Sequence, residues 1–509
     1  MEIFKVVYTS IILSKTGSPI PIFASERACH SKYNPQKEAE QFISTIFYSD
    51  LFIVLGIGGA FHINALQKKF PAAKIIAIEY THDDIAFLLA NSDIVKKTIS
   101  AGNVMFITPE KIESALCENF IPAVYPTLSI VEWRTWKNEL PNQSEAILHQ
   151  INETIKRISQ DFATQSKFGK IWQHAILKNI HFLQKNEIPL PPLEKTAIVL
   201  AAGPSLEKNI DIIKRNRQDF FVISTDTAYT VLKKSDVFCD VVVSIDGQTI
   251  SATHFLGNHN EKTLFVFDIS GNHQAIHTLH KNGNPILFSQ NGHPLAQYIE
   301  KKSGKNLFFP LDAGNGTVTL SCVDFALKLG FEKIIVSGAD FGYRETKTYA
   351  RGTYLDTLYA SSQTKTTSFE TQFLHLYFRS NLIKVTDKKN TTPLLDSYRK
   401  SFEDWANKNG LDISCEHENY ILKKIAGHTV KKNWANFQNE ELNFSALKQS
   451  IVSDIKNHPP LKEFRSSDIL IAILPFISYL RTQKNAVSEQ DETLINLALD
   501  DFMKYTNLL

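Results

Sequence analysis

The stretch of this chain that most constrains its fold is residues 196–206, TAIVLAAGPSL. Six apolar residues run directly into Gly203-Pro204-Ser205-Leu206, so a buried parallel strand is expected to end in a glycine turn from which a helix begins at once. The N-terminus of such a helix presents unpaired N–H groups and a positive dipole end at the edge of the sheet. The stretch therefore predicts an α/β fold with an anion site, above all for phosphate, at this turn.

The length and the charge of the chain limit the classes of protein to which it can belong. A chain of 509 residues is too long for one ordinary core, so two or three domains are expected. Hydrophobic residues make up 43% of the chain and charged residues 21%, which is typical of a soluble globular protein. The net charge of +2 gives no global field that would attract nucleic acid or a membrane surface.

The cysteines and the first residues of the chain indicate its compartment. The five cysteines are an odd number and form no C-x-x-C motif, which favours reduced thiols over a disulfide framework. The apolar first residues lack the basic start and the small-residue cleavage site of a signal peptide. No window reaches the roughly 18 apolar residues that a membrane helix needs. We therefore expect a cytoplasmic protein without a membrane span.

Short apolar runs separated by helical patterns predict an N-terminal Rossmann-like domain in residues 1–140. The expected parallel strands are the runs 52–59, 74–80 and 103–108. Residues 141–190 have helical spacing and predict a connector of one or two helices, which the proline-rich run IPLPPL ends.

A second series of strands and helices fills residues 191–395 and predicts a central nucleotide-sugar-binding, doubly wound unit. Its expected strands are the runs AIVLAA, FFVIST, DVVVSI, TLFVFDI, PILFS and KIIVSG. Residues 396–509 are polar and helical in pattern, so a helical C-terminal region is expected. The predicted fold class is α/β, with two Rossmann-like units followed by helices.

Three loops of the central unit are expected at the carboxyl edge of its sheet, where open α/β folds bind ligands. One is the turn at Gly203, one follows FFVI, and one runs from Asp312 to Tyr343. Since the three loops are expected to meet, we predict that they share one nucleotide. The predicted nucleotide-binding residues are Gly203, Pro204, Ser205, Leu206, Thr225, Asp226, Asn315, Gly316, Thr317 and Gly338.

The first unit carries another glycine turn, Gly56-Ile57-Gly58-Gly59, with Glu79 at the end of the next strand. Glycines allow a cofactor to approach closely and an acid can bind ribose hydroxyls, so the pattern resembles a dinucleotide or adenosyl-cofactor fingerprint. The third glycine of G-x-G-x-x-G is missing. We therefore favour the alternative, a degenerate Rossmann-like domain that binds no cofactor.

Together, GPSL after an apolar strand, a helix-opening Gly-Thr and LGFEKIIVSGADFGY resemble the bacterial sialyltransferases. They resemble more closely the motility-associated factor (Maf) glycosyltransferases, which are thought to attach nonulosonic acids to flagellin from CMP-activated donors. The match covers residues 197–353 and, more loosely, the whole chain. A sibling group with the same GPSL core includes archaeal hydroxymethylpterin pyrophosphokinases, so the core defines a superfamily better than a substrate.

The resemblance implies roles for residues near the GADF turn. In the sialyltransferases two tyrosines six positions apart bond the leaving CMP phosphate, and Tyr343 and Tyr349 have that spacing here. Asp340 and Asp246, at the ends of predicted strands, are the candidates for the general base. Arg351 makes this loop positive and is expected to bind the carboxylate or phosphate of the donor.

The spacing of the histidines and the absence of metal-binding motifs argue against a bound metal ion. His273, His277 and His280 have helical spacing, but no fourth ligand completes a zinc site, so a polar helix face is expected. His375, in the aromatic run FLHLYF, is expected to be packed rather than catalytic. The chain has no D-x-D motif and no P-loop. We therefore expect no bound metal and no cofactor.

The resemblance implies an inverting glycosyltransferase that transfers a nonulosonic acid of pseudaminic or legionaminic type from CMP to Ser or Thr of flagellin, a step required for flagellar assembly and motility. Two alternatives stay open. One is an enzyme that transfers pyrophosphate from Mg-ATP to a pterin alcohol, in which Asp226 and Asp246 would hold the metal. The other is a non-catalytic factor that binds flagellin.

Overall fold

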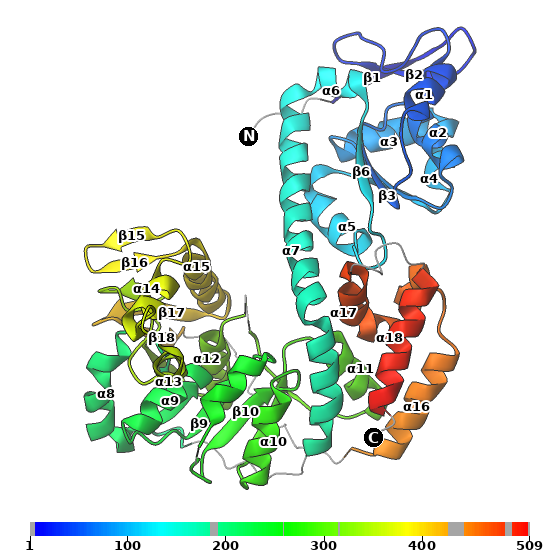
Figure 1. Ribbon diagram of the computed structural model, residues 1–509. Helices are drawn as coiled ribbons and strands as arrows, with labels where there is room; N and C mark the ends of the chain where they lie inside the picture. Colours follow the sequence, from blue (N-terminus) through cyan, green and yellow to red (C-terminus); the bar gives the residue numbers. More distant parts are fainter. Residues whose placement is uncertain are drawn as a thin grey trace. The chain divides into compact units, whose positions relative to one another are not determined.

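The computed structural model describes residues 6–183, 192–257, 259–313, 316–425, 442–483 and 491–506 (Figure 1). The chain forms two compact units. Unit 1 comprises Met1–Gly169, Pro460–Glu463 and Pro475–Ile495, and unit 2 comprises Lys170–Pro459, Phe464–Leu474 and Asn496–Leu509. The last helices are thus divided between the units, whereas the sequence predicted residues 396–509 as a region of their own. Most of the proline-rich run predicted as a boundary, residues 188–191, lies outside the described residues.

Unit 1 contains a parallel sheet with the strand order β5-β4-β3-β6. The three predicted strands are present as β3, β4 and β5, whereas β6 and the separate β1–β2 hairpin are not predicted by the pattern. The strands are β1 (Tyr8–Leu13), β2 (Pro19–Phe23), β3 (Leu51–Leu55), β4 (Lys74–Ile78), β5 (Val104–Ile107) and β6 (Leu128–Glu132). The helices are α1 (Pro35–Ser44), α2 (Phe61–Lys69), α3 (His82–Asn91), α4 (Asp93–Ile99), η1 (Pro109–Lys111), α5 (Ile112–Asn119) and α6 (Arg134–Glu139).

The predicted helical connector is one long helix, α7 (Pro141–Asn179), followed by the short η2 (Ile180–Phe182). Its apolar residues Ile147 and Ile151 belong to the core of unit 1, and the helix continues into unit 2 after Gly169. The isoleucine spacing read from the sequence therefore gives the buried stripe of this helix.

Unit 2 contains a sheet with the strand order β12-β11-β10-β9-β8-β7-β13-β18-β17. The strands from β12 to β13 are parallel, and β18 and β17 add an antiparallel edge. All six predicted strands are present, because each apolar run is buried in the middle of a parallel sheet. The strands are β7 (Thr196–Leu200), β8 (Phe220–Thr225), β9 (Val241–Ser244), β10 (Leu264–Asp268), β11 (Ile286–Gln290), β12 (Phe309–Pro310), β13 (Lys333–Ser337), β17 (Leu411–Glu416) and β18 (Asn419–Lys424).

The β17–β18 hairpin corrects the prediction that the chain is helical beyond residue 396. Its turn places His417 and Glu418 at positive φ, and β18 pairs with β13. Apolar and polar residues alternate through LDISC, whereas YILKK is an apolar run followed by two lysines, and both suit strands near the edge of a sheet. The edge of the sheet therefore comes from a segment that lies within the region predicted to be helical.

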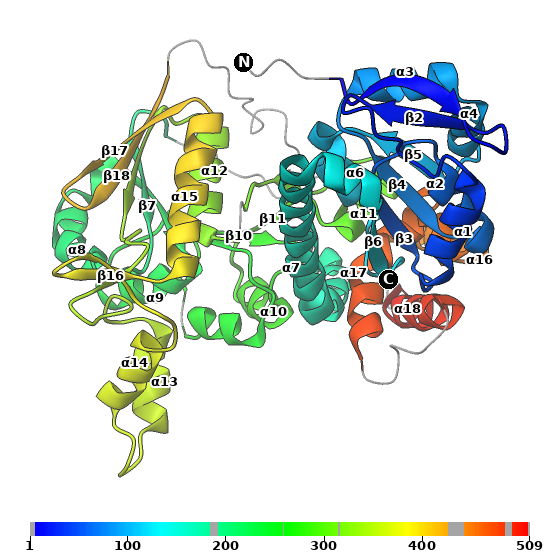
Figure 2. The ribbon, with the colours of Figure 1, turned by 90° about the horizontal axis from the view of Figure 1, so that it is seen from above.

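Helices cover both faces of this sheet, and Figure 2 shows α8 on one side of β7 with α12 and α15 on the other. The helices of unit 2 are α8 (Leu206–Arg215), η3 (Arg217–Asp219), α9 (Asp226–Lys234), η4 (Thr249–Phe255), α10 (His273–Lys281), α11 (Pro294–Ser303), α12 (Val318–Leu329), α13 (Tyr354–Ser362), α14 (Phe369–Tyr377), α15 (Pro393–Lys408) and α16 (Phe444–Lys456). The helices η6 (Leu461–Ser466), α17 (Asp468–Thr482) and α18 (Asp491–Thr506) include residues of both units. A small sheet has the order β14-β16-β15, from β14 (Tyr343–Arg344), β15 (Ile383–Thr386) and β16 (Lys389–Thr391).

The order of strands in unit 2 reverses at β7. From β7 the chain builds β8 to β12 on one side, and it returns to place β13 on the other side. The carboxyl ends of β7 and β13 therefore lie at a switch point, the place where open α/β sheets bind ligands. In the ranges given above, no helix has both the length and the apolar character needed to cross a membrane.

Candidate functional site

A cavity of about 240 Å³ lies in unit 2 at the carboxyl ends of β7, β8 and β13. The start of α12, the loop before α13 and one turn of α15 complete its wall. The structure thus joins segments from Gly203 to Tyr398 around one space. The residues of the wall that the sequence predicted for the site are Gly203, Thr225, Asp226, Thr317, Gly338, Asp340, Tyr343 and Tyr349.

Other predicted residues of the GPSL turn and the third loop lie away from this cavity. Ser205 and Leu206 are fully buried and take no part in its wall, so the serine hydroxyl does not face a ligand there, contrary to the prediction. Pro204 lines a neighbouring cavity of about 590 Å³ whose other residues are mostly charged. Gly316 is outside the wall, and Asn315 lies outside the described residues.

The N–H groups of the GPSL turn are already bonded within the protein. Gly203 N donates to Gly338 O at 2.8 Å, and Ser205 N donates to Asp340 Oδ2 at 2.8 Å. The next two N–H groups donate to carbonyl oxygens of the turn itself. The Asp340 carboxylate therefore lies at the positive end of α8, where the sequence predicted a phosphate. The turn shapes the cavity wall but offers no free N–H group to an anion.

Asp340 holds two loops together rather than standing free as a base. Its second carboxylate oxygen accepts a hydrogen bond from Arg344 Nε. Arg344 Nη1 in turn donates to Glu418 Oε1 at 2.7 Å. With a guanidinium on one oxygen and the Ser205 N–H on the other, the charge of Asp340 is compensated before any substrate arrives. The geometry therefore favours the local, turn-forming role of Asp340 over proton transfer.

Thr225 and Asp226 end β8 and begin α9. Thr225 Oγ1 accepts from Ala228 N at 3.3 Å and caps the helix. Asp226 is 4% exposed; its Oδ1 accepts from Thr227 N at 2.7 Å, and its Oδ2 accepts from Ser244 Oγ at 2.8 Å. No lysine, arginine or histidine of the described residues forms an ion pair with it. Asp226 is thus a cavity carboxylate bonded to neutral donors alone.

Both predicted tyrosines reach the cavity. Desolvation raises the pKa of Tyr349 to about 12, with further contributions from Tyr354 and Tyr343, so its phenol is a hydrogen-bond donor at neutral pH. Burial also raises the pKa of Tyr343, against the effect of Arg379. The ring of Tyr343 lies 5.4 Å from that of Tyr377, which fixes its place beside the small sheet. The six-residue spacing therefore does put two phenols on one wall.

Hydroxyl groups supply most of the remaining polar wall. Thr317 Oγ1 caps α12 by accepting from Leu320 N at 3.2 Å. Thr348 is 4% exposed, and its hydroxyl has no hydrogen-bond partner in the described part of the protein. A buried hydroxyl without a partner is costly unless a ligand or water completes its bonding. The wall therefore contains at least one polar group that is left for a ligand.

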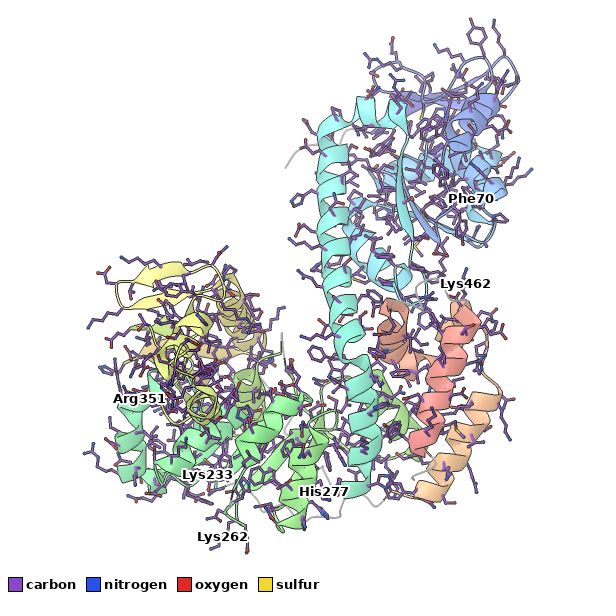
Figure 3. All side chains as sticks on the ribbon, viewed as in Figure 1. Phe70, Lys233, Lys262, His277, Arg351 and Lys462 are labelled. Carbon is purple, nitrogen blue, oxygen red and sulfur yellow. The ribbon has the colours of Figure 1, made fainter. Side chains whose placement is uncertain are left out.

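The wall contains no lysine or arginine, as far as the chain is described. Lys347 Nζ donates to Glu207 Oε2 at 2.7 Å, away from the cavity. Arg351 has an exposed side chain, labelled in Figure 3, and its backbone N–H donates to Glu207 Oε1 at 2.8 Å. In the loop predicted to be positive, the side chain of Lys347 is thus in an ion pair and the side chain of Arg351 is exposed to solvent. Contrary to the prediction, Arg351 is not placed to bind the donor.

Two further predictions concern single residues outside the wall. Asp246 follows β9 and accepts from its own neighbour Gln248, from N at 2.9 Å and from Nε2 at 3.2 Å. It is not part of the cavity wall, so the structure does not support it as the base. His375 is exposed on α14, and the prediction that it is packed is wrong, because the helix turns only part of its aromatic run inward.

α15 contributes Leu395 and Tyr398 to the wall, and the sequence did not predict them. Its amphipathic pattern accounts for the buried Phe402 and Trp405, which join the core of unit 2. No sequence motif distinguishes Leu395 and Tyr398, which precede Phe402 in the same helix. Only the packing of α15 against the sheet shows that this face of the helix meets the loops at the carboxyl ends of β7, β8 and β13.

The glycine turn of unit 1 is filled by the protein itself. The buried Glu79 carboxylate accepts from Trp136 Nε1 at 2.6 Å, from Tyr8 Oη at 2.9 Å and from Ile57 N at 3.0 Å. Burial raises the pKa of Glu79 to about 7. A Cβ at Gly56 would lie 2.5 Å from Trp136 Cγ. The acid and the glycine turn that would meet a cofactor are thus in contact with side chains of unit 1 itself.

The histidines of α10 gather around one aromatic ring. The ring centroids of His273, His277 and His280 lie 5.6, 6.0 and 4.8 Å from that of Phe182 (His277 is labelled in Figure 3). His273 Nδ1 and Asn179 Oδ1 are 2.9 Å apart. Among the residues that the structure describes, no group of three or more His, Cys, Asp or Glu is arranged to hold a metal ion.

Comparison with known proteins gives matches to the central unit and to the chain as a whole. Residues 174–346 match the family described as 6-hydroxymethylpterin diphosphokinase MptE-like. This match contains the GPSL turn, β8 and β13, and it ends before Tyr349 and α15.

Two proteins of Treponema pallidum (strain Nichols), each described as an uncharacterized protein, are similar in sequence. One is 31% identical over 168 residues, which are 31% of this chain and 80% of the relative. The other is 26% identical over 274 residues, 53% of this chain and 86% of the relative. A solved structure of a Maf glycosyltransferase from Magnetospirillum magneticum AMB-1 matches 99% of this chain and 91% of that chain, with 11% identity and a TM-score of 0.47. Similarity at that level does not establish a shared activity.

Proposed function

We propose that this chain is a glycosyltransferase that uses a CMP-linked nonulosonic acid. The chain belongs to the family of the first Treponema pallidum relative. The observation that carries the proposal is the cavity at the switch point of unit 2. It joins the turn at Gly203, the ends of β8 and α12, and the two tyrosines. These are the segments on which the resemblance to the Maf and sialyltransferase families rests.

The cavity wall suits a donor with a single phosphate. Tyr343 and Tyr349 would donate hydrogen bonds to the phosphate as negative charge develops on its leaving oxygen. Thr227 and Thr317 add hydroxyls within the same wall. Phenols and hydroxyls are uncharged donors, so no cation has to lose its water when the phosphate binds. They can stabilise a monophosphate leaving group without a metal. The proposed reaction is therefore a metal-independent single displacement that inverts the anomeric centre and needs no cofactor.

The acceptor that we propose is a Ser or Thr hydroxyl of flagellin, modified in the cytoplasm before the filament is assembled. Transfer of pseudaminic or legionaminic acid would make the protein part of flagellar assembly and motility. This step rests on the family resemblance, because fold and cavity shape do not by themselves name an acceptor. Unit 1, whose glycine turn is filled, is free to serve in binding this acceptor.

A second candidate function is favoured by the MptE-like match over residues 174–346. An enzyme of that type would move pyrophosphate from ATP to a pterin alcohol and would hold magnesium with carboxylates. Asp226 is in the cavity wall and could serve, but Asp246 is outside it. The two candidates therefore differ in which nucleotide binds and in whether magnesium is needed.

Calorimetry on the full chain with CMP, CTP and ATP, each with and without magnesium, separates the candidates. We expect CMP to bind without magnesium, and Thr227→Val to weaken that binding about tenfold by removing a wall hydroxyl together with its 3.2 Å hydrogen bond to Asp226 Oδ1. Thr230→Val is the matched control, because Thr230 lies on the same helix α9 but outside the wall. ATP binding that requires magnesium would support the pyrophosphokinase instead. Binding of no nucleotide would support a non-catalytic flagellin-binding factor.

A further inference from the structure

The proposed transfer needs a group that accepts the proton of the attacking hydroxyl. Carboxylates and histidines usually do this, within hydrogen-bond reach of that proton. In the described part of the chain, the cavity wall has two carboxylates, Asp226 and Asp340, and no histidine. The choice of base therefore lies between two residues that follow β8 and β13, the strands on either side of β7.

Asp340 is the weaker candidate because its partners compensate its charge. Arg344 bonds one carboxylate oxygen and the Ser205 N–H bonds the other. Protonation of Asp340 would break an ion pair and would release the positive end of α8, so its carboxylate is a poor acceptor of a proton.

We propose that Asp226 is the catalytic base of this transferase, an inference that rests on the proposed function. The sequence indicated Asp226 only as a nucleotide-binding residue or a magnesium ligand. Its Oδ1 accepts from Thr227 N at 2.7 Å and from Thr227 Oγ1 at 3.2 Å, and its Oδ2 accepts from Ser244 Oγ at 2.8 Å; these neutral donors orient the carboxylate without neutralising it. Oδ2, which accepts one bond, keeps lone-pair capacity for another donor, such as the hydroxyl of an acceptor.

The surroundings of Asp226 place the base and the leaving group in one space. The negative charge of Asp226 contributes to the raised pKa of Tyr349, so the two side chains act on each other electrostatically. Ser244, at the end of β9 and 1% exposed, is fixed by its strand and directs the carboxylate. Asp226 and Tyr349 therefore line one cavity, and the anomeric carbon of a bound donor would lie between them, because a single displacement needs the base and the leaving group on opposite faces of that carbon.

The proposed transfer forms one bond at the anomeric carbon and breaks another. The hydroxyl oxygen of the acceptor forms a bond to the anomeric carbon while the bond from that carbon to the phosphate oxygen breaks. The phosphate leaves with the electron pair as CMP and receives hydrogen bonds from the phenols. The proton of the acceptor hydroxyl passes to the Asp226 carboxylate and is later released to solvent. No oxidant, reductant or metal enters the balance.

The test compares Asp226→Asn with wild-type full-length protein in two measurements. Calorimetry gives the affinity for CMP, and CMP release gives turnover with CMP-N-acetylneuraminate, CMP-pseudaminate and CMP-legionaminate, with water or flagellin as acceptor. We expect kcat to fall about 10²- to 10⁴-fold, the usual value of a general base, while the Kd for CMP changes by less than about threefold. Retained CMP binding also shows that the variant folds.

Two further variants test whether the effect is specific to the Asp226 carboxylate. Ser244→Ala keeps the carboxylate and removes one orienting bond, so a smaller loss of kcat, about tenfold, is expected. Asp236→Asn makes the same chemical change just beyond the other end of α9, at an exposed residue outside the wall, and should leave both measurements unchanged.

The outcomes distinguish the inference from the proposed function. Turnover of Asp226→Asn within about fivefold of wild type would overturn the inference. A loss of CMP affinity as large as the loss of kcat would also overturn it, because Asp226 would then be a binding residue. Wild-type protein that binds no CMP, or that uses none of the three donors, would contradict the proposed function, and the inference would fall with it.

Discussion

Tyr349 illustrates what a single side chain contributes to a cavity without cations. It comes from the loop before α13, is 39% exposed, and lines the space that Gly203 and Thr317 also line. Desolvation keeps its phenol protonated far above neutral pH. The side chain can therefore donate a hydrogen bond to a phosphate at any pH well below about 12.

Tyr349→Phe removes that donor and keeps the ring. We expect kcat for CMP release to fall about 10²-fold, because the bond is strongest when charge develops on the phosphate, while the Kd for CMP changes little. Tyr359→Phe on α13 is the matched control, since Tyr359 packs on Phe373 at 4.8 Å and is not in the wall. Equal losses in affinity and turnover would instead make Tyr349 a simple binding residue.

At the scale of elements, the site depends on how the loop after β7 meets the loop after β13. Ala201 N donates to Ser337 O at 2.8 Å, and Gly203 N donates to Gly338 O at the same distance. Gly338 has a φ of +76°, and its carbonyl lies where a side chain at residue 203 would begin. The close approach of the two loops is what requires glycine at the GPSL turn.

Gly203→Ala should therefore disturb the site through sterics alone. A Cβ at this position would overlap the Asp340 carboxylate and the Gly338 carbonyl oxygen. We expect about 1–3 kcal/mol lower free energy of unfolding and a loss of CMP binding measured by calorimetry. Gly283→Ala is the control, because Gly283 has positive φ but open space around it; it should cost about 1 kcal/mol and leave CMP binding intact. Full CMP affinity in Gly203→Ala would mean that the turn does not shape the site.

At the scale of the whole molecule, two Rossmann-like units differ in what occupies the end of their sheets. In unit 1, Trp136 and the buried Glu79 fill the place above the glycine turn. In unit 2 the corresponding edge is an open cavity. The same class of fold thus provides a closed core in one unit and an open cavity in the other.

Trp136→Ala tests this division of roles. Trp136 is 0% exposed, so its loss should lower the free energy of unfolding by about 3–5 kcal/mol in urea denaturation. CMP affinity of the folded protein should not change, because the proposed site belongs entirely to unit 2. Phe47→Ala, at a residue that is 89% exposed in unit 1, serves as control and should stay within about 0.5 kcal/mol of wild type. A large gain in nucleotide binding on removal of Trp136 would show that unit 1 keeps a hidden site.

The sequence by itself determined most of the parallel strands of both units and the glycine turns that follow them. Runs such as TAIVL and KIIVS are apolar throughout, and a strand buried on both faces needs no more than that local pattern. The same reasoning placed Gly203, Asp226 and Thr317 at strand or helix ends, and the family resemblance indicated Tyr349; all four residues line one cavity. Signals of this kind lie within a few residues of one another, so the sequence carries them directly.

The tertiary structure decided which of these groups remain available to a ligand. The Ser205 N–H is bonded to an aspartate 135 residues away, Arg344 is paired with Asp340 and Glu418, and Tyr398 reaches the wall only because α15 packs beside the sheet. Whether a donor is free, a cation is paired or a crevice is filled depends on contacts between distant segments. No local pattern in the chain encodes that, because the energy of each contact exists only after the sheet has brought the partners together.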